Sequence, residues 1–136
     1  MATRFIKIAV LYLAVGVTLD LIMGIRQSFA LAPVHAHINL LGWASLALVG
    51  LVYHAYPQAA ETRLARIHFW LHNIGLPPLM IALALMLSGN TAMEPVVGIF
   101  SIVVALGIAL FVINVWMAVR PAAAPAALRA GAVAAR

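Results

Sequence analysis

The amino-acid sequence predicts an all-α integral membrane protein that folds as a four-helix bundle. Hydrophobic residues make up 66% of the 136 residues and charged residues only 8%, whereas soluble domains are about 45–50% apolar and about 25% charged. The chain contains four apolar runs, each about as long as the 20 residues that cross a bilayer as a helix. A chain of this length has room for one compact domain, so the four spans are expected to pack together.

The first two predicted spans lie in the first half of the chain. The first covers about 5–24; it has no clear small-residue cleavage site and three more spans follow it, so we expect a retained helix and not a cleaved signal peptide. The second span covers 33–56 and begins at Pro33. Pro57 ends it, because proline lacks an amide donor and clashes with the preceding turn.

The second half of the chain supplies two further spans and a tail. The turn sequence SGN ends the third span, 64–87, and Pro95 suits the first turn of the fourth span, 94–119. Residues 121–136 are rich in Ala and Pro, and we expect them to form a loose cytoplasmic tail. The four-helix domain is therefore predicted within residues 1–120.

The eight Lys and Arg residues are divided unevenly between the two sides of the predicted bundle. Seven lie at the start of span one, between spans two and three, or after span four, and Arg26 alone lies on the other side. Because basic loops remain cytoplasmic, we expect a multi-pass protein of a bacterial-type inner membrane with both termini in the cytoplasm. The net charge of +5 does not indicate nucleic-acid binding, since the basic residues flank apolar runs and suit lipid headgroups.

Polar side chains within the spans are the candidates for function, because such groups are costly in a membrane. The chain has no cysteine, which excludes disulfides, thiolate metal sites and cysteine nucleophiles. The remaining candidates form two layers. The predicted outer layer contains Asp20, Met23, His35, His37, Asn39, Met93 and Glu94, and the predicted inner layer contains His54, His68 and His72.

His35 and His37 are the main candidates, and helical geometry sends them in different directions. A helix turns about 100° per residue, so the two side chains point about 200° apart. Neutral imidazole is the commonest metal ligand and a standard axial ligand of heme iron. We therefore expect protein or cofactor on both sides of the second span. The alternative is that both histidines snorkel to the outer headgroups or bond to the loop.

Three further residues are expected to support these imidazoles: Asp20, Asn39 and Trp43. Asp20 is predicted at the same depth as the two histidines, and a carboxylate often orients a ligating imidazole. Ion pairing or hydrogen bonding without a metal accounts for Asp20 equally well.

The inner histidines admit two interpretations. His68 and His72 lie four residues apart and share a helical face with Gly75. This spacing can hold a metal ion, or it can place two interfacial histidines near the headgroups. His54 lies at a span end and is expected to snorkel. Within one chain, His37 and His72 should differ in depth by more than about 10 Å, whereas two axial ligands of one iron lie about 4 Å apart.

The histidine segments resemble a known family. HAHINLLGW, GLVYHAYP and RLARIHFWLHNIG resemble part of the catalytic subunit of heme-copper oxidases and nitric oxide reductases, with the C-type oxidase and nitric oxide reductase branch nearest. That family has twelve helices in three arcs of four. The second helix of its last arc carries a His-x-His motif that binds two hemes, one on each side. The resemblance implies that His35 and His37 bind heme iron. The HAH motif is also similar to that of a heme- and copper-containing membrane family linked to nitric oxide stress.

The departures from the family bear on assembly. One chain supplies one arc of the three, without an adjacent His-His pair or a tyrosine placed like the family's cross-linked one, so a lone chain is not expected to be a terminal oxidase. Three identical chains would supply twelve helices, and closed cyclic homo-oligomers are common. Six imidazoles would then match the axial positions of three hemes. We therefore expect a homotrimer that mimics the twelve-helix subunit, with heme b between subunits.

Three functions are compatible with these features. The first is a heme b-binding protein for electron transfer or for redox or gas sensing, with an unidentified electron donor; as an enzyme it would be an oxidoreductase acting on oxygen or nitric oxide. The second is a copper- or heme-handling assembly protein without catalysis. In that case Met23 and Met93 would join Asp20, His35 and His37, because thioether and imidazole suit copper. The third is a structural partner without a cofactor.

Overall fold

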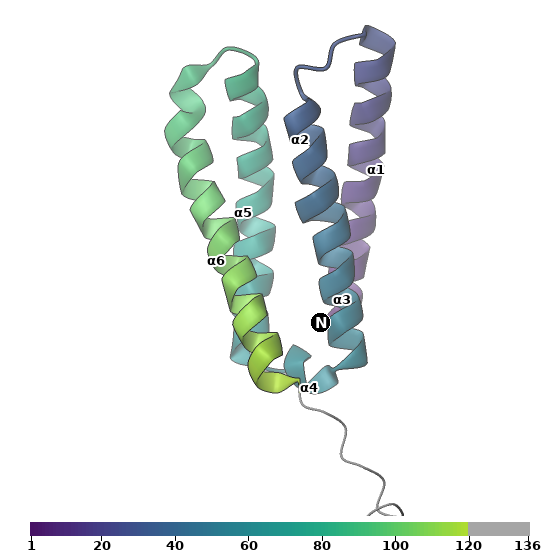
Figure 1. The fold of residues 1–136 in the computed structure, drawn as a ribbon, viewed down its shortest axis with the longest axis vertical. Coiled ribbons are helices and arrows are strands. Elements are labelled where there is room, and N and C mark those ends of the chain that lie inside the picture. Colours follow the sequence, from purple (N-terminus) through teal and green to yellow (C-terminus); the bar gives the residue numbers. More distant parts are fainter. Residues whose placement is uncertain (120–136) are drawn as a thin grey trace, which may run out of the picture.

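A computed structural model describes residues 1–119, which form two helical hairpins lying side by side (Figure 1). The first hairpin pairs α1 with a long helix made of three consecutive segments, and α4 connects it to the second hairpin. In chain order the elements are α1 (Ala2–Arg26), α2 (Ala32–His37), η1 (Ile38–Ser45), α3 (Leu46–Ala55), α4 (Pro57–Ala60), α5 (Arg63–Leu87), η2 (Thr91–Met93) and α6 (Glu94–Ala118).

Four helices are long and apolar enough to cross a membrane, and they agree with the predicted spans to within about one turn: Ala2–Arg26, Ala32–Ala55, Arg63–Leu87 and Thr91–Ala118. Large apolar side chains cover their outer surface. Leu11, Ile102 and Trp116 are 67%, 62% and 87% exposed, which suits lipid and not water. The described chain is therefore all-helical and consistent with a multi-pass membrane protein. The predicted tail, 121–136, lies outside the described residues.

The two ends of the bundle differ. Loops 27–31 and 88–90 lie at one end, called here the loop end, whereas α4 and the beginnings of α1 and α5 lie at the other, the α4 end (Figure 1). Arg4, Lys7, Arg63 and Arg66 belong to the α4 end and Arg26 to the loop end. The uneven distribution of basic residues seen in the sequence is thus a difference between the two ends of the described bundle.

Glycines allow α1 to lie very close to the second span. A Cβ atom on Gly42 would lie 2.5 Å from Cγ of Tyr12, and one on Gly50 would lie 2.6 Å from Cγ1 of Ile6. Small residues let membrane helices approach closely and gain dispersion contacts. Both glycines therefore face α1 of their own chain.

The helix α5 continues without interruption through Pro77 and Pro78. Each proline removes one backbone donor, which would break most helices in water. In membrane helices, prolines are tolerated because neighbouring helices and local adjustments satisfy the freed carbonyls. The residues on either side of the prolines are well packed: Leu76, Leu79 and Met80 belong to a buried cluster with Val104 of α6.

A buried polar network joins four elements at the α4 end. The Asn114 side chain of α6, 1% exposed, donates from Nδ2 to the Ala59 carbonyl at 2.8 Å and to the Tyr53 hydroxyl at 3.2 Å. The Thr62 hydroxyl donates to Asn114 Oδ1 at 2.7 Å and accepts from the Ala65 amide at 3.0 Å, which caps α5. The network fixes α6 against α3, α4 and the start of α5.

Candidate functional site

His35 lies on the side of the second span that packs against α1. Its Nδ1–H donates to the Gly16 carbonyl at 3.1 Å, and the imidazole is partly buried. Asn39 lies one helical turn after His35 and donates to the His35 carbonyl at 3.0 Å. It also packs closely on Gly16, since a Cβ atom on Gly16 would lie 2.5 Å from Asn39 Nδ2. With the proton on Nδ1, the neutral ring has its lone pair on Nε2.

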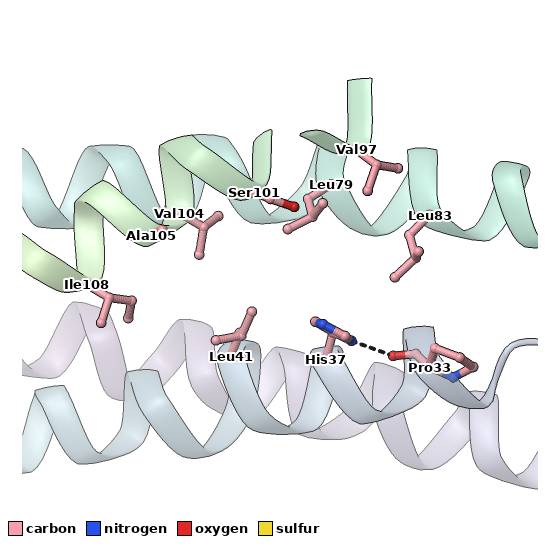
Figure 2. A pocket seen from close by; sticks show the side chains of 10 residues that line it. All are labelled: Pro33, His37, Leu41, Leu79, Leu83, Val97, Ser101, Val104, Ala105 and Ile108. Atoms are coloured by element: carbon pink, nitrogen blue, oxygen red, sulfur yellow. Dashed lines mark hydrogen bonds between the residues drawn. The ribbon is translucent and has the colours of Figure 1, made fainter. Parts of the chain in front are cut away.

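His37 projects from α2 into a groove on the other side of the second span (Figure 2). The groove has a volume of about 450 Å³ and runs between this span and the α5–α6 hairpin. His37 and Ser101 contribute its polar side chains; its other lining residues are Pro33, Leu41, Leu79, Leu83, Val97, Val104, Ala105 and Ile108. His37 Nδ1–H donates to the Pro33 carbonyl at 2.7 Å, so its Nε2 also carries a lone pair.

The two imidazoles therefore serve different surfaces, as the helical rotation predicts. His35 contacts α1, and His37 lines the groove with α5 and α6. Each ring is held through Nδ1 by a backbone carbonyl, which is a common arrangement behind metal-ligating histidines. Among residues 1–119, no three His, Asp or Glu side chains gather in a way that could hold a metal ion. His35 and His37 of one chain thus lie on different surfaces of the second span.

The predicted supporting residues are only partly placed beside the histidines. Asn39 contacts His35, but Asp20 is exposed on α1, and the carbonyls of Gly16 and Pro33 occupy the Nδ1 atoms that Asp20 was expected to orient. Trp43 packs instead against the buried cluster that contains Phe5 and Leu46. Among residues 1–119, no hydrogen bond joins Asp20 or Trp43 to either imidazole, and their supporting roles stay predictions.

The predicted outer copper ligands likewise do not come together. Met23 is 4% exposed in α1, whereas Asp20 is exposed on the same helix. Met93 ends the short η2 turn at the entrance to α6, and Glu94 next to it is exposed. Thus no observation in the described chain favours an outer copper site over a site built on His35 and His37.

His68 and His72 are buried inside the bundle and do not lie at its surface. Both are 0% exposed, so the interfacial interpretation of this pair is wrong, whereas His54 is exposed on α3. Neither ring nitrogen of His68, nor Nδ1 of His72, has a hydrogen-bond partner among the described residues. An unsatisfied buried polar atom costs about 1–3 kcal/mol, so these three nitrogens require an explanation.

An unexpected π-helical segment positions His72. The segment η1, Ile38–Ser45, interrupts the α-helical second span, and His72 Nε2–H donates to the Leu41 carbonyl within it at 3.0 Å. Such segments are uncommon and often occur at functional sites. His37 is held by the Pro33 carbonyl one turn nearer the loop end and lines the groove, whereas His72 is not among the residues that line it. The described hydrogen bonds therefore do not join His37 to His72.

Two polar residues that line the groove or bond inside the bundle were not singled out in the sequence. Ser101 lines the groove opposite His37 (Figure 2), and Asn114 organises the buried network at the α4 end. A signal for both was present, because they are polar residues inside the most apolar of the four spans, where each such residue is costly.

No protein-family model, curated protein or solved structure matches this chain. The fold and the histidine positions therefore define its class only broadly. Residues 1–119 are all-helical, with four candidate membrane spans and two imidazoles on opposite sides of one of them.

Proposed function

We propose that this protein is a heme b-binding integral membrane protein that transfers electrons or senses a redox partner or gas, with each heme held by two histidines from adjacent subunits. The observation that carries the proposal is the tautomer and the direction of each imidazole in the His-x-His pair. Backbone carbonyls fix Nδ1–H of both rings, so each ring has its lone pair on Nε2, on opposite sides of one helix; the Nε2 atom of His35 also lies 3.4 Å from Asn39 Nδ2, a long contact that an iron ligand would replace.

The groove beside His37 suits a flat, apolar prosthetic group. Its volume of about 450 Å³ falls within the range of about 300–1,000 Å³ typical of cofactor sites. Aliphatic side chains form most of its walls, and His37 projects into it (Figure 2). A heme bound there would supply one-electron redox chemistry. The chain itself would supply the axial imidazole, the apolar walls that exclude water and the Ser101 hydroxyl as a polar contact.

The second axial ligand is proposed to come from another copy of the chain. No other histidine lines the groove, and His35 of the same chain lies on the opposite side of the second span. A second subunit could present its own His35, since that ring is only partly buried. Three copies would bring together twelve such spans, with six imidazoles for three hemes. Two imidazoles per iron leave no open position, which favours electron transfer.

The optical spectrum of the purified protein tests the proposal. The wild type should bind heme and show a low-spin spectrum when reduced, with no response to carbon monoxide. His37→Gly should lose the low-spin spectrum and bind carbon monoxide, and added imidazole should restore the spectrum, because it can occupy the space left in the groove. His54→Gly is the matched control, since His54 is exposed at the other end of the span. A low-spin spectrum retained by His37→Gly without imidazole contradicts the proposal.

The proposal includes an orientation: an inner membrane of the bacterial type, with the α4 end and both termini in the cytoplasm. The cysteine-free chain allows a direct test. A single cysteine at Ser28, in the loop end, should react with a membrane-impermeant maleimide in intact cells. One at Glu61, between α4 and α5, should react only after the membrane is opened. Both residues are exposed, and the reverse pattern rejects this orientation.

A further inference from the structure

The buried pair His68–His72 has geometry suited to holding an ion. The residues lie four apart on α5, and their ring centroids are 5.6 Å apart with an interplanar angle of 81°. Side chains at this spacing lie on the same helical face. Two metal–nitrogen bonds of about 2 Å place the ligating nitrogens at most about 4 Å apart, a separation compatible with ring centroids 5.6 Å apart.

The ring nitrogens are available for such an ion. His72 donates Nε2–H to the Leu41 carbonyl, so Nδ1 of the neutral ring carries the lone pair. His68 has one lone-pair nitrogen in either tautomer, and neither of its nitrogens has a partner among the described residues. The Leu41 carbonyl thus fixes the His72 tautomer in the way that carbonyls fix ligating histidines elsewhere.

The surroundings are aromatic and carry no opposite charge. Phe5 of α1 stacks on His68 at 5.3 Å with an interplanar angle of 22°, and Phe111 of α6 lies 5.3 Å away on a tilted plane. Gly107 of α6 lies over the pair, where a Cβ would be in van der Waals contact with the His72 amide nitrogen at 3.4 Å and with Cδ2 of His68 at 3.7 Å. Acidic side chains do not gather with the pair among residues 1–119.

We infer that His68 and His72 form a two-coordinate site for a cuprous ion. Zinc takes four ligands, or three and a water, and a buried dication with two neutral ligands would be strongly disfavoured. A cuprous ion is monovalent, accepts two imidazoles and is suited to nitrogen donors. The faces of Phe5 and Phe111 would add cation–π attraction. The site is separate from the heme proposed at His35 and His37 and does not depend on it.

Competition with a chromogenic cuprous chelator under anaerobic, reducing conditions tests the inference. The full-length protein in detergent should retain stoichiometric Cu⁺ against bicinchoninate, and X-ray absorption should show two nitrogen neighbours at about 2 Å. Zn²⁺ under the same conditions should not be retained. Equal retention of Zn²⁺, or copper with three or more protein ligands, overturns the cuprous assignment.

Two variants identify the ligands. His68→Phe keeps an aromatic ring between Phe5 and Phe111, and His72→Gln keeps an N–H donor for the Leu41 carbonyl. Each should lower the affinity for Cu⁺ by more than about tenfold, since a ligand is lost. The matched control His54→Phe should bind as the wild type does. If both variants retain wild-type affinity, the pair is not a copper site.

The variants also separate the two proposals. The double variant His35→Ala/His37→Ala should keep Cu⁺ and lose heme, whereas His68→Phe should keep the heme spectrum and lose Cu⁺. Loss of Cu⁺ binding in the His35/His37 variant would overturn the assignment to the buried pair. If the wild type binds heme, an unchanged heme spectrum also verifies that His68→Phe folds. If the wild type binds no heme, an unchanged thermal unfolding transition verifies it.

Discussion

At the scale of single residues, Asn114 is the polar group on which the packing of α6 most depends. We predict that Asn114→Ala lowers the free energy of unfolding in mixed micelles by about 2 kcal/mol, because it removes three bonds and leaves the buried Tyr53 hydroxyl without a partner, while Thr62 and the Ala59 carbonyl keep only their longer mutual bond of 3.3 Å. Asn73→Ala is the matched control, since Asn73 bonds only to the Phe69 carbonyl one turn back in its own helix. Equal losses in the two variants would mean that the network does not stabilise the bundle.

The residue scale also shows where sequence reasoning succeeds. The opposite directions of His35 and His37 follow from helical rotation alone, which is local. Their partners could not be predicted in the same way. The Gly16 carbonyl reaches His35 because α1 packs closely there, and this depends on how two distant segments fit together. The burial of His68 likewise depends on Phe5 and Phe111, which come from α1 and α6.

At the scale of elements, the span positions were predictable and the internal irregularity was not. The ends of the four spans agree with the sequence because bilayer length and helix-breaking residues define them. The π-helical segment Ile38–Ser45 has no local signal, since INLLGWAS would form an ordinary α-helix equally well. The segment faces α5, and the Leu41 carbonyl within it accepts the hydrogen bond from His72 Nε2–H.

Gly42 and Gly50 also show that the sequence alone does not identify the partner of a residue. From sequence, Gly42 and Gly50 could face a neighbouring subunit or a neighbouring helix, since both uses need a residue without a side chain. In the structure they face Tyr12 and Ile6 of α1. The outward surface of the second span is instead lined by Leu40, Leu48 and Leu51, which are 64%, 61% and 55% exposed. A subunit contact through this span would therefore involve leucines and not glycines.

At the scale of the whole molecule, the arrangement of hairpins decides what one chain can do alone. The groove opens between the hairpins and contains one histidine, and the other histidine of the pair faces α1. A single chain can therefore offer one imidazole to a heme in the groove. Two imidazoles on one iron require a second chain, so axial ligation and oligomeric state are coupled in the proposal.

Mixed assemblies test this coupling. His35→Ala and His37→Ala chains, each with a different affinity tag, should separately show no low-spin heme. Assemblies containing both tags should regain it, because the intact His37 of one chain can meet the intact His35 of the next. In a closed trimer one interface of the three has both ligands, so the recovered low-spin heme should be about one third of the wild-type amount, and in a dimer about one half. If mixed assemblies recover none although the wild type binds heme, then both ligands come from one chain or from elsewhere, and the ligation between subunits is wrong.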